Sequence, residues 1–466
     1  MTTSVSNLAS AKATNVILHA FDWPYQRVTE KAAAIADAGF KAVLVSPPMK
    51  SHKSKNGTEW WQRYQPQDYR VIDNQLGNTD DFIAMTNILK ACNVDIYVDV
   101  VFNHMANESH LRGDLNYPSE AVKTDYLAAD KYFEKLKLFG DLSGNLFSES
   151  DFVKAFPIQN WNDPWQVQHG RISGGHDDPG LPTLKCNKNV VKKQQQYLIA
   201  LKQLGVNGFR IDAAKHLTLE HIQQVWDEEI SAGTHIFGEI ITDGGASKEE
   251  YNLFLEPYLK DTSLGAYDFP LFHSIFNSLE NDKPISDLVN PYSVGEALAY
   301  DRAITFTITH DIPNNDVFLK QVMSEKNELL AYCYILGRDG GVPLIYSDLN
   351  ASGINNINGE PRWYDAWQNQ TLARMIKFHN LMHGEPMHHI EASPEHIVFC
   401  RGKKGMVAIN KSESTISIDL PEGVYQEILG LPEVTLSPSN PSNLQDGEGK
   451  QTLILTGISC AMLEKR

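Results

Sequence analysis

Residues 208–216, GFRIDAAKH, are the stretch around which this chain is organised. Apolar Phe209 and Ile211 alternate with charged residues, which predicts a short buried strand whose carboxyl end becomes polar. Arg210 lies two residues before Asp212, so both side chains leave the same side of the strand, and the guanidinium would keep the carboxylate ionised. Such a carboxylate could act as a nucleophile. The plainer interpretation of this stretch alone is a salt bridge followed by a helix cap.

Strands and helices alternate on both sides of this stretch. Helical spacing predicts helices at 28–38, 81–92, 190–204 and 217–230. The expected strands are 15–21, 42–46, 95–102, 208–212, 235–239, 265–269, 304–309 and 342–346. Because repeated strand–helix units form parallel sheets, eight of them predict an α/β fold, a closed (β/α)8 TIM barrel. The active site of such a barrel lies at the carboxyl ends of its strands.

Two parts of the chain break this alternation. Between residues 105 and 187, Gly, Asp, Asn and Pro are frequent and no regular pattern persists. A structureless loop of this length is implausible inside a compact domain, so we expect a small inserted domain after the third strand. Short alternating strands over 386–466 predict a C-terminal antiparallel β-sandwich domain. The barrel itself would comprise 1–104 and 188–385.

The composition is that of a soluble globular enzyme. The 466 residues include 41 Lys plus Arg and 58 Asp plus Glu, and the net charge of -17 argues against a nucleic-acid partner. No long apolar run follows Met1 or occurs elsewhere, so we expect no membrane partner, a cytoplasmic location and a monomer. A signal peptide removed beforehand would leave the same picture and mean secretion. The five Cys form no CxxC pair, which argues against a thiolate metal site.

Polar side chains follow several of the predicted strands. Each has a structural explanation when taken singly, such as a cap, an ion pair or a loop hydrogen bond. Because the carboxyl ends of parallel strands meet at one rim of a barrel, we expect these side chains to converge there. They are Asp99, Asn103 and His104 at the third strand, Arg210, Asp212, Lys215 and His216 at the fourth, Glu239 at the fifth, and His310 and Asp311 at the seventh.

Four short segments resemble, in order, the four sequence motifs of the alpha-amylase family of glycoside hydrolases. They are DVVFNH (99–104), GFRIDAAKH (208–216), the Glu of FGEI (237–240) and FTITHD (306–311). WWQRYQP at 60–66 resembles a further substrate-site segment of many alpha-amylases. The similarity covers essentially the whole chain, including the inserted and C-terminal domains.

The resemblance implies a role for each matching residue. Asp212 would be the nucleophile, Glu239 the general acid/base, and Asp311 the carboxylate that binds substrate hydroxyls and helps distort the sugar ring. Glu239 would then be protonated near neutral pH, which neighbouring carboxylates would favour. The implied substrate-binding residues are Trp60, Trp61, Tyr64, Gln65, His104, Arg210, Lys215, His216 and His310.

Within that set, Tyr64 would stack beneath the sugar in the cleaved subsite, and His104 and His310 would hydrogen-bond it. Lys215 and His216 match positions on the leaving-group side. Trp60 and Trp61 could line the donor side, and ordinary core packing is an equally good interpretation of at least one of them.

The sequence departs from the family at its ion sites. Thr309 stands where chloride-activated members have an Asn ligand, and Pro343 of GVPLIY stands at a basic position, so we do not expect chloride. Asn103, the backbone carbonyl of His216 and Gln168 match calcium-site positions, whereas Thr183 replaces a carboxylate. Because carboxylates raise calcium affinity most, we expect a weak calcium site or none. Asp177 and Asp178 are near enough in sequence to compensate.

The resemblance implies retaining endo-hydrolysis of alpha-1,4-glucosidic bonds in starch, glycogen or maltooligosaccharides, through a covalent glycosyl-Asp intermediate. A 4-alpha-glucanotransferase of the same family would use the same residues. A non-catalytic glucan-binding protein is a further alternative, but its barrel would be expected to have lost at least one of the three carboxylates.

Overall fold

The computed structural model describes residues 16–53, 59–174, 177–438 and 451–466. The chain start at Met1, the first residue of the expected first strand, Asn15, and Gly175–His176 lie outside the described residues. Within them, no helix is long and apolar enough to cross a membrane.

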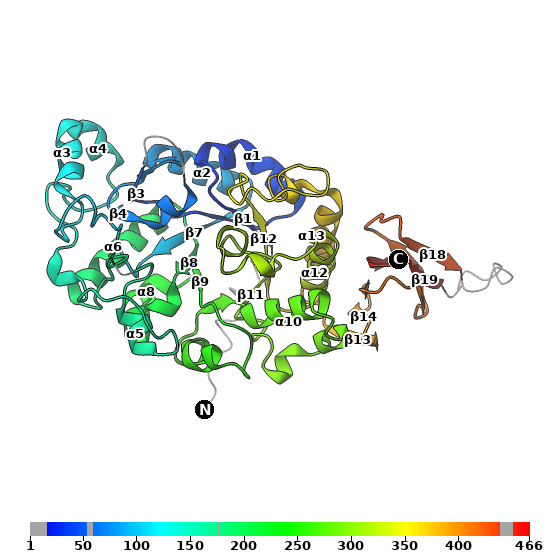
Figure 1. Ribbon diagram of the computed structural model, residues 1–466. Helices are drawn as coiled ribbons and strands as arrows, with labels where there is room; N and C mark the ends of the chain where they lie inside the picture. Colours follow the sequence, from blue (N-terminus) through cyan, green and yellow to red (C-terminus); the bar gives the residue numbers. More distant parts are fainter. Residues whose placement is uncertain (1–15, 54–58, 175–176, 439–450) are drawn as a thin grey trace, which may run out of the picture.

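Eight parallel strands close into a barrel in the order β1-β12-β11-β10-β9-β8-β7-β2, which confirms the predicted fold class. These strands lie at the centre of the larger body in Figure 1. Each runs at a predicted position: β8 has the predicted bounds, β12 ends one residue later, β11 begins one residue earlier and ends earlier, and the others are shorter. Their bounds are β1 Ile17–Ala20, β2 Ala42–Val45, β7 Asp95–Val101, β8 Gly208–Asp212, β9 His235–Gly238, β10 Gly265–Tyr267, β11 Ala303–Phe306 and β12 Val342–Ser347.

The barrel strands are almost wholly buried, because helices cover the outside and side chains of facing strands fill the inside. Gly208 opens β8 because the Tyr97 ring of β7 lies against it: an added Cβ would come within 2.1 Å of that ring. Gly39 ends the first helix in a left-handed conformation, φ 101°, as its place after the helical pattern predicts.

The helices of the barrel follow the expected pattern with one correction. The continuous helix predicted for 217–230 is wrong: it is split, because Asp227 accepts a hydrogen bond from the Ile230 N–H and starts a new helix. The helices are α1 Tyr25–Ala38, α2 Thr79–Ala91, α6 Lys188–Gln203, α7 Leu219–Val225, α8 Glu228–Ser231, α9 Glu256–Asp261, α10 Phe269–Glu280, α11 Asp311–Asn314, α12 Glu325–Gly337 and α13 Gln370–Leu381.

Short helical turns and strand pairs complete the barrel's rim. A five-residue π-helix, η5 Tyr251–Leu255, precedes α9. The 3-10 turns are η2 Trp60–Tyr64, η4 Ala214–His216, η6 Ile285–Leu288, η7 Pro291–Val294, η8 Leu319–Gln321 and η9 Ala366–Gln368. The small strand pairs are β3 Lys50–Ser51 with β4 Pro66–Asp68, and β5 Asp73–Asn74 with β6 Gly77–Asn78.

The segment after β7 is irregular, with short helices α3 Glu120–Ala128, α4 Asp130–Leu136 and α5 Pro164–His169 and the turn η3 Glu149–Asp151. Backbone hydrogen bonds tie its end to the root of the segment. The Leu184 N–H donates to the Asn103 carbonyl at 2.8 Å, and the Met105 N–H donates to the Pro182 carbonyl at 3.0 Å. The segment therefore leaves and rejoins the barrel beside the end of β7.

The C-terminal strands form two antiparallel sheets, of order β13-β14-β15-β20-β17 and β16-β19-β18. Alternating side chains of β15 serve two cores: Met406 and Ala408 pack toward the smaller sheet, while Val407 and Ile409 join the barrel core. The bounds are β13 Met387–Ala392, β14 His396–Arg401, β15 Gly405–Asn410, β16 Ile416–Asp419, β17 Tyr425–Glu427, β18 Val434–Pro438, β19 Gln451–Leu455 and β20 Ser459–Lys465. The sheets project from the barrel at the right of Figure 1.

Candidate active site

The strand register brings the first two carboxylates together. Ile211 of β8 pairs with Gly238 of β9, so Asp212 and Glu239, the next residues, leave the barrel rim side by side. The Glu239 N–H donates to the Ile211 carbonyl at 3.0 Å, which extends the pairing to the end of both strands. Two carboxylates thus stand at the carboxyl ends of adjacent strands, where barrel enzymes carry their chemistry.

Arg210 is the common partner of the acidic side chains. Its guanidinium is fully buried and hydrogen-bonds Asp99, Glu239 and Asp212, the last at 3.2 Å. The Ala213 N–H also donates to Glu239, at 3.0 Å. Because one rigid fork of N–H groups holds three carboxylates, their relative positions are fixed.

Burial dominates the protonation of this cluster. Burial raises the pKa of Asp212 well above its usual value, although Arg210 opposes the shift. Burial also raises the pKa of Asp311 well above its usual value, and the charge on Glu239 adds to that shift. Burial alone would raise the pKa of Glu239 too, but Arg210, a hydrogen bond with Asp311 and the Ala213 N–H together lower it. In the free protein these shifts run opposite to the expected ones: the pKa of Glu239 is lowered and the pKa of Asp212 is raised, while Arg210 shares its charge among several acids.

Asp311 and His310 follow β11 and join the cluster from the other side. Asp311 opens α11 and hydrogen-bonds Glu239. The His310 Nε2 lies 3.3 Å from an Asp311 carboxylate oxygen. Burial, with the positive charge of Arg210, holds the pKa of His310 well below its usual value, so the ring is neutral.

Aromatic rings orient His310. It stacks on Tyr64 at 5.3 Å between centroids and on Phe21 at 4.6 Å, and Trp60 meets it edge-on at 5.8 Å. The Tyr64 hydroxyl donates to Asp99 at 2.9 Å. Trp60 therefore lies in the site as well as in the core, which reconciles the two interpretations of that residue.

The turn that carries these rings is anchored by a buried ion pair. Arg63 donates to both carboxylate oxygens of Asp22, at 2.7 and 3.0 Å, and to the Glu59 carbonyl at 2.8 Å. Asp22 lies two residues after the end of β1. The pair therefore fastens η2 to the end of the first strand and fixes where Trp60 and Tyr64 lie.

The other predicted substrate-binding residues do not all lie beside the carboxylates. The Gln65 amide oxygen accepts from the Asn107 N–H at 2.8 Å, so it supports the inserted segment. The His104 Nε2 lies 3.0 Å from the Tyr64 carbonyl, and burial lowers the pKa of His104 to about 4. Trp61 is 41% exposed and stacks on His52 at 6.4 Å, away from the His310 cluster of rings.

Lys215 and His216 lie in η4, directly after β8. The Lys215 ammonium donates to Glu250 at 2.8 Å and to the Ile241 carbonyl at 3.1 Å. The His216 Nδ1 lies 2.9 Å from the Val167 carbonyl, and burial lowers the pKa of His216 to about 4. Both side chains thus link the turn after Asp212 to neighbouring segments.

Three of the four predicted calcium residues surround one cavity. Asn103, Gln168 and His216 line a space of about 280 Å³, together with Lys185 and the exposed Glu220. Thr183 does not line it, because its hydroxyl donates to the Gly170 carbonyl at 2.8 Å. The described residues contain no group of three or more His, Cys, Asp or Glu placed to hold a metal ion. The cavity lining therefore holds one carboxylate, Glu220, and a lysine, whereas a strong calcium site needs several carboxylates.

The aspartates near Thr183 do not replace the missing carboxylate. Asp178 accepts hydrogen bonds from the Asn107 side chain, at 2.8 and 2.9 Å, and from the Gly180 N–H at 2.9 Å. Neither Asp177 nor Asp178 lines the cavity.

Two residues of the site were missing from the sequence-based set. Asp22 and Glu250 hold functional side chains in place but lie apart from them in sequence. Asp99 was expected at the rim, and it lies inside β7 in register with Arg210. Only the folded chain reveals the partners of Asp22 and Glu250.

Comparison with known proteins agrees with this geometry. The family model described as the catalytic domain of alpha amylase matches residues 24–263. An alpha-amylase from Aeromonas hydrophila is 48% identical over 399 residues, which cover 86% of this chain and 84% of that protein. An alpha-amylase from Thermomonospora curvata is 28% identical, covering 91% of this chain and 69% of that protein.

Two solved structures share the fold. Alpha-amylase I from Eisenia fetida superposes with a TM-score of 0.70 at 21% identity, covering 97% of this chain and 95% of that chain. A cyclomaltodextrin glucanotransferase with a three-domain distribution superposes with a TM-score of 0.68 at 19% identity, covering 97% and 99%. Together with the family model and the Aeromonas hydrophila relative, these findings establish that the chain belongs to the alpha-amylase family of glycoside hydrolases.

Proposed function

We propose that this protein cleaves alpha-1,4-glucosidic bonds within starch, glycogen or maltooligosaccharides and retains the anomeric configuration. The observation that carries the proposal is that one guanidinium, that of Arg210, hydrogen-bonds both Asp212 and Glu239. This contact keeps the two carboxyl groups close, as a retaining pair about 5–5.5 Å apart requires. An inverting pair needs room for a water between them and stands farther apart.

In the proposed reaction, Asp212 attacks the anomeric carbon while Glu239 gives its proton to the departing glycosidic oxygen. A covalent glycosyl-Asp212 ester forms and the rest of the glucan leaves as an alcohol. Glu239, now ionised, takes a proton from water, which attacks the ester and releases the sugar and free Asp212. Protons balance, because Glu239 ends the cycle protonated.

In the proposed reaction, Asp311 holds the proton that Glu239 needs. Asp311 has a raised pKa and hydrogen-bonds Glu239, so substrate binding can move a proton from one to the other without exchange with solvent. A neutral Glu239 no longer raises the pKa of Asp212 by its charge, and Arg210 then favours the ionised nucleophile. The same proton transfer thus prepares both the acid and the nucleophile.

The surrounding side chains would bind the sugar on both sides of the cleaved bond. The Tyr64 ring offers a face for stacking, and the neutral His104 and His310 offer hydrogen bonds to hydroxyls. Lys215 and His216, which follow the nucleophile, would meet the departing part of the glucan. The exposed Trp61 would contact a longer chain at the edge of the site.

Digestion of soluble starch tests the proposal. We expect viscosity to fall before much reducing sugar appears, because internal bonds are cut, and NMR of the first products should show the alpha anomer. First products with the beta anomer would refute the nucleophile role of Asp212.

A glucanotransferase is the second candidate, because a cyclomaltodextrin glucanotransferase shares this fold over 97% of the chain. Added maltose or glucose distinguishes the two activities. A transferase would form longer or cyclic products at the expense of reducing ends, whereas a hydrolase would release reducing ends at a rate that the acceptor changes little. A protein that bound glucan without cleaving it would contradict both.

A further inference from the structure

The segment 248–255 connects three parts of the molecule beside the catalytic carboxylates. Glu250 pairs with Lys215 of η4 at 2.8 Å, and its neighbour Glu249 accepts from the Asn162 side chain of the inserted segment at 3.0 Å. The π-helix η5 follows immediately, a conformation that often marks functional positions. Glu249 therefore contacts the inserted segment, and Glu250 contacts η4.

Lys215 is tied to the acid/base strand twice. Its backbone N–H donates to the Glu239 carbonyl at 3.3 Å, and its ammonium donates to the Ile241 carbonyl, two residues further on, at 3.1 Å. Glu239 protonates the glycosidic oxygen, which stays with the departing part of the glucan. The Lys215 ammonium contacts residue 241, just after Glu239. It therefore lies on the side of the site that receives the departing sugar.

The Lys215 ammonium has three N–H donors. Two of them donate to Glu250 and to the Ile241 carbonyl, which leaves the third for a hydroxyl of the substrate. Its side chain is 10% exposed and lies over the Phe254 ring at 4.9 Å, so Glu250 and Phe254 restrict where the remaining donor points. Without Glu250, the flexible stem would lose its strongest restraint.

We propose that Glu250 is a positioning residue that aims the Lys215 ammonium at a hydroxyl of the sugar on the departing side. The inference rests on the proposed retaining reaction, in which an acceptor sugar enters through the position that the departing sugar leaves. Glu250 therefore sets how well the enzyme uses a sugar, rather than water, to release the glycosyl group.

The test compares two substrates that differ only in what occupies the departing side. Maltoheptaose places sugars there, whereas 4-nitrophenyl alpha-maltotrioside can place only an aromatic alcohol. For Glu250→Ala we expect kcat/KM on maltoheptaose to fall about tenfold, as loss of a charge-assisted hydrogen bond implies, with a change of less than about threefold on the aryl substrate. The fraction of transfer products formed with added maltose should fall in parallel.

Three further variants define the cause. Glu250→Gln keeps an acceptor oxygen for Lys215, so it should recover part of the loss and serves if Glu250→Ala folds poorly. Glu249→Ala is the matched control, since it removes the neighbouring carboxylate but not the contact with Lys215. In a Lys215→Ala background, Glu250→Ala should have no further effect on maltoheptaose.

Equal losses on both substrates, or none on either, would overturn the inference while leaving the proposed function intact. An additive effect in the Lys215→Ala background would also overturn it. A wild-type protein that cleaved neither substrate would refute the proposed function and the inference with it.

Discussion

At the scale of single residues, Arg210 determines the electrostatics of the site. It is the cation nearest to Asp99, Asp212 and Glu239, and all four groups are almost fully buried. Charges in such surroundings are costly unless they are paired, so burial raises the pKa of Asp99 to about 6 and that of Asp212 well above its usual value, although Arg210 opposes both shifts. The site therefore titrates as a unit rather than as separate acids.

The roles of Asp212 and Glu239 lead to the first prediction. Asp212→Asn or Glu239→Gln should each lower kcat on starch by about 10⁴-fold or more, because the amide can neither form the ester nor give up a proton. Circular dichroism and thermal melting should show that the fold persists. An Asp212→Asn protein that was free of contaminating enzyme and kept near-normal turnover would refute the assignment.

A second prediction is that activity does not depend on chloride. Arg210 uses its terminal nitrogens on carboxylates, Thr309 brings no amide, and Pro343 in β12 brings no positive charge. We expect equal rates on starch in sodium chloride and in sodium acetate of the same ionic strength. Saturable activation by millimolar chloride would show that an anion site exists beside Arg210.

At the scale of elements, short turns rather than helices hold the site. The turn η2 is fixed by the Arg63–Asp22 pair, and η4 is preceded by Ala213, whose φ of 48° is rare for a residue with a side chain. That strained position directs the Ala213 N–H to Glu239. The strands thus set the spacing of the carboxylates, and the turns aim the groups around them.

The packing of α13 on α12 gives a third prediction, on pH. The His379 Nδ1 lies 3.1 Å from the Leu336 carbonyl, and burial lowers the pKa of His379 to about 4 from 6.5. The unfolded chain therefore binds a proton that the native state does not, so stability present above pH 6.5 is lost as the pH falls toward 4. His379→Asn should reduce the slope of unfolding free energy against pH, between about 4.5 and 6, by about 1 kcal/mol per pH unit.

Urea unfolding followed by circular dichroism at several pH values measures this slope. Leu372→Ala on the same helix is the control, because it removes buried apolar contacts without removing a titrating group. It should lower stability by a similar amount at every pH. An unchanged slope in His379→Asn would mean that His379 is not the group responsible.

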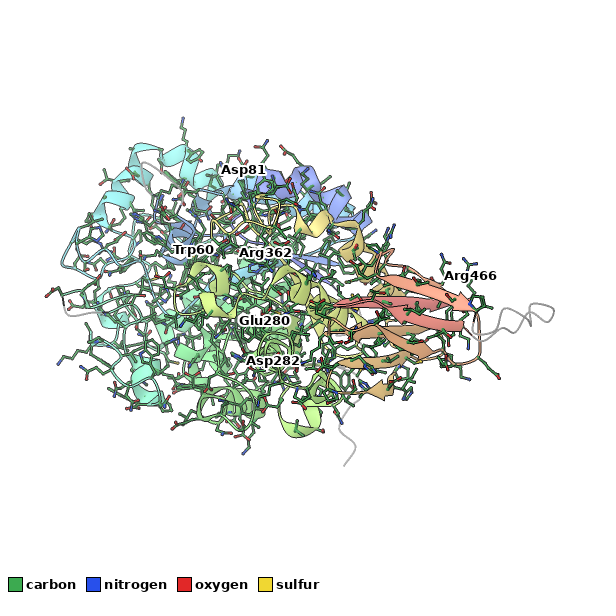
Figure 2. The ribbon with its side chains drawn as sticks, turned by 45° about the vertical axis from the view of Figure 1, so that its right-hand side comes forward. Trp60, Asp81, Glu280, Asp282, Arg362 and Arg466 are labelled. Carbon is green, nitrogen blue, oxygen red and sulfur yellow. The ribbon has the colours of Figure 1, made fainter. Side chains whose placement is uncertain are left out.

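At the scale of the whole molecule, the C-terminal sheets and the inserted segment are attached in different ways. The larger sheet buries one face against α12, and Arg401 donates to the carbonyls of Gly337, Arg338 and Met382. Figure 2 places Trp60 within the larger body and Arg466 out along the C-terminal strands. The carboxylate cluster around Arg210 therefore belongs to the barrel, since Asp99, Asp212 and Glu239 lie in or directly after barrel strands.

The attachment of the inserted segment gives the last prediction, that calcium binds weakly if at all. We propose that hydrogen bonds, in place of a calcium ion, hold the inserted segment against the barrel. These include Thr183 to Gly170, and the contact between His216 and the Val167 carbonyl. Treatment with a chelator should change the melting temperature and activity little, because stabilisation by a ligand scales with its affinity. A large loss of both, restored by micromolar calcium, would contradict a weak site.

Thr183→Asp is the complementary variant for calcium, with Thr183→Asn as the neutral control. Because Thr183 does not line the cavity of Asn103 and His216, we expect neither variant to raise the melting temperature in calcium. A melting temperature that calcium raised in the Asp variant but not in the Asn variant would mean that position 183 faces an ion.

Much of the fold follows from the sequence. Largely apolar runs marked all eight barrel strands, because each strand is buried on both faces. The rim positions of Asp212 and Glu239, which we propose as catalytic, were predicted because a polar residue at the carboxyl end of a barrel strand lies at the rim. The family resemblance then assigned roles that strand position alone leaves open.

Only the tertiary structure decided which charges meet. The sequence predicted that Arg210 pairs with Asp212, two residues away in the strand. In the folded barrel the guanidinium also hydrogen-bonds Asp99 and Glu239. For this reason the pKa of Glu239 shifts downward, opposite to the expected direction. Likewise Asp22 with Arg63, and Glu250 with Lys215, are separated by 41 and 35 residues. Local patterns determine which residues reach the rim, whereas pKa values depend on distances that exist only after the barrel has closed.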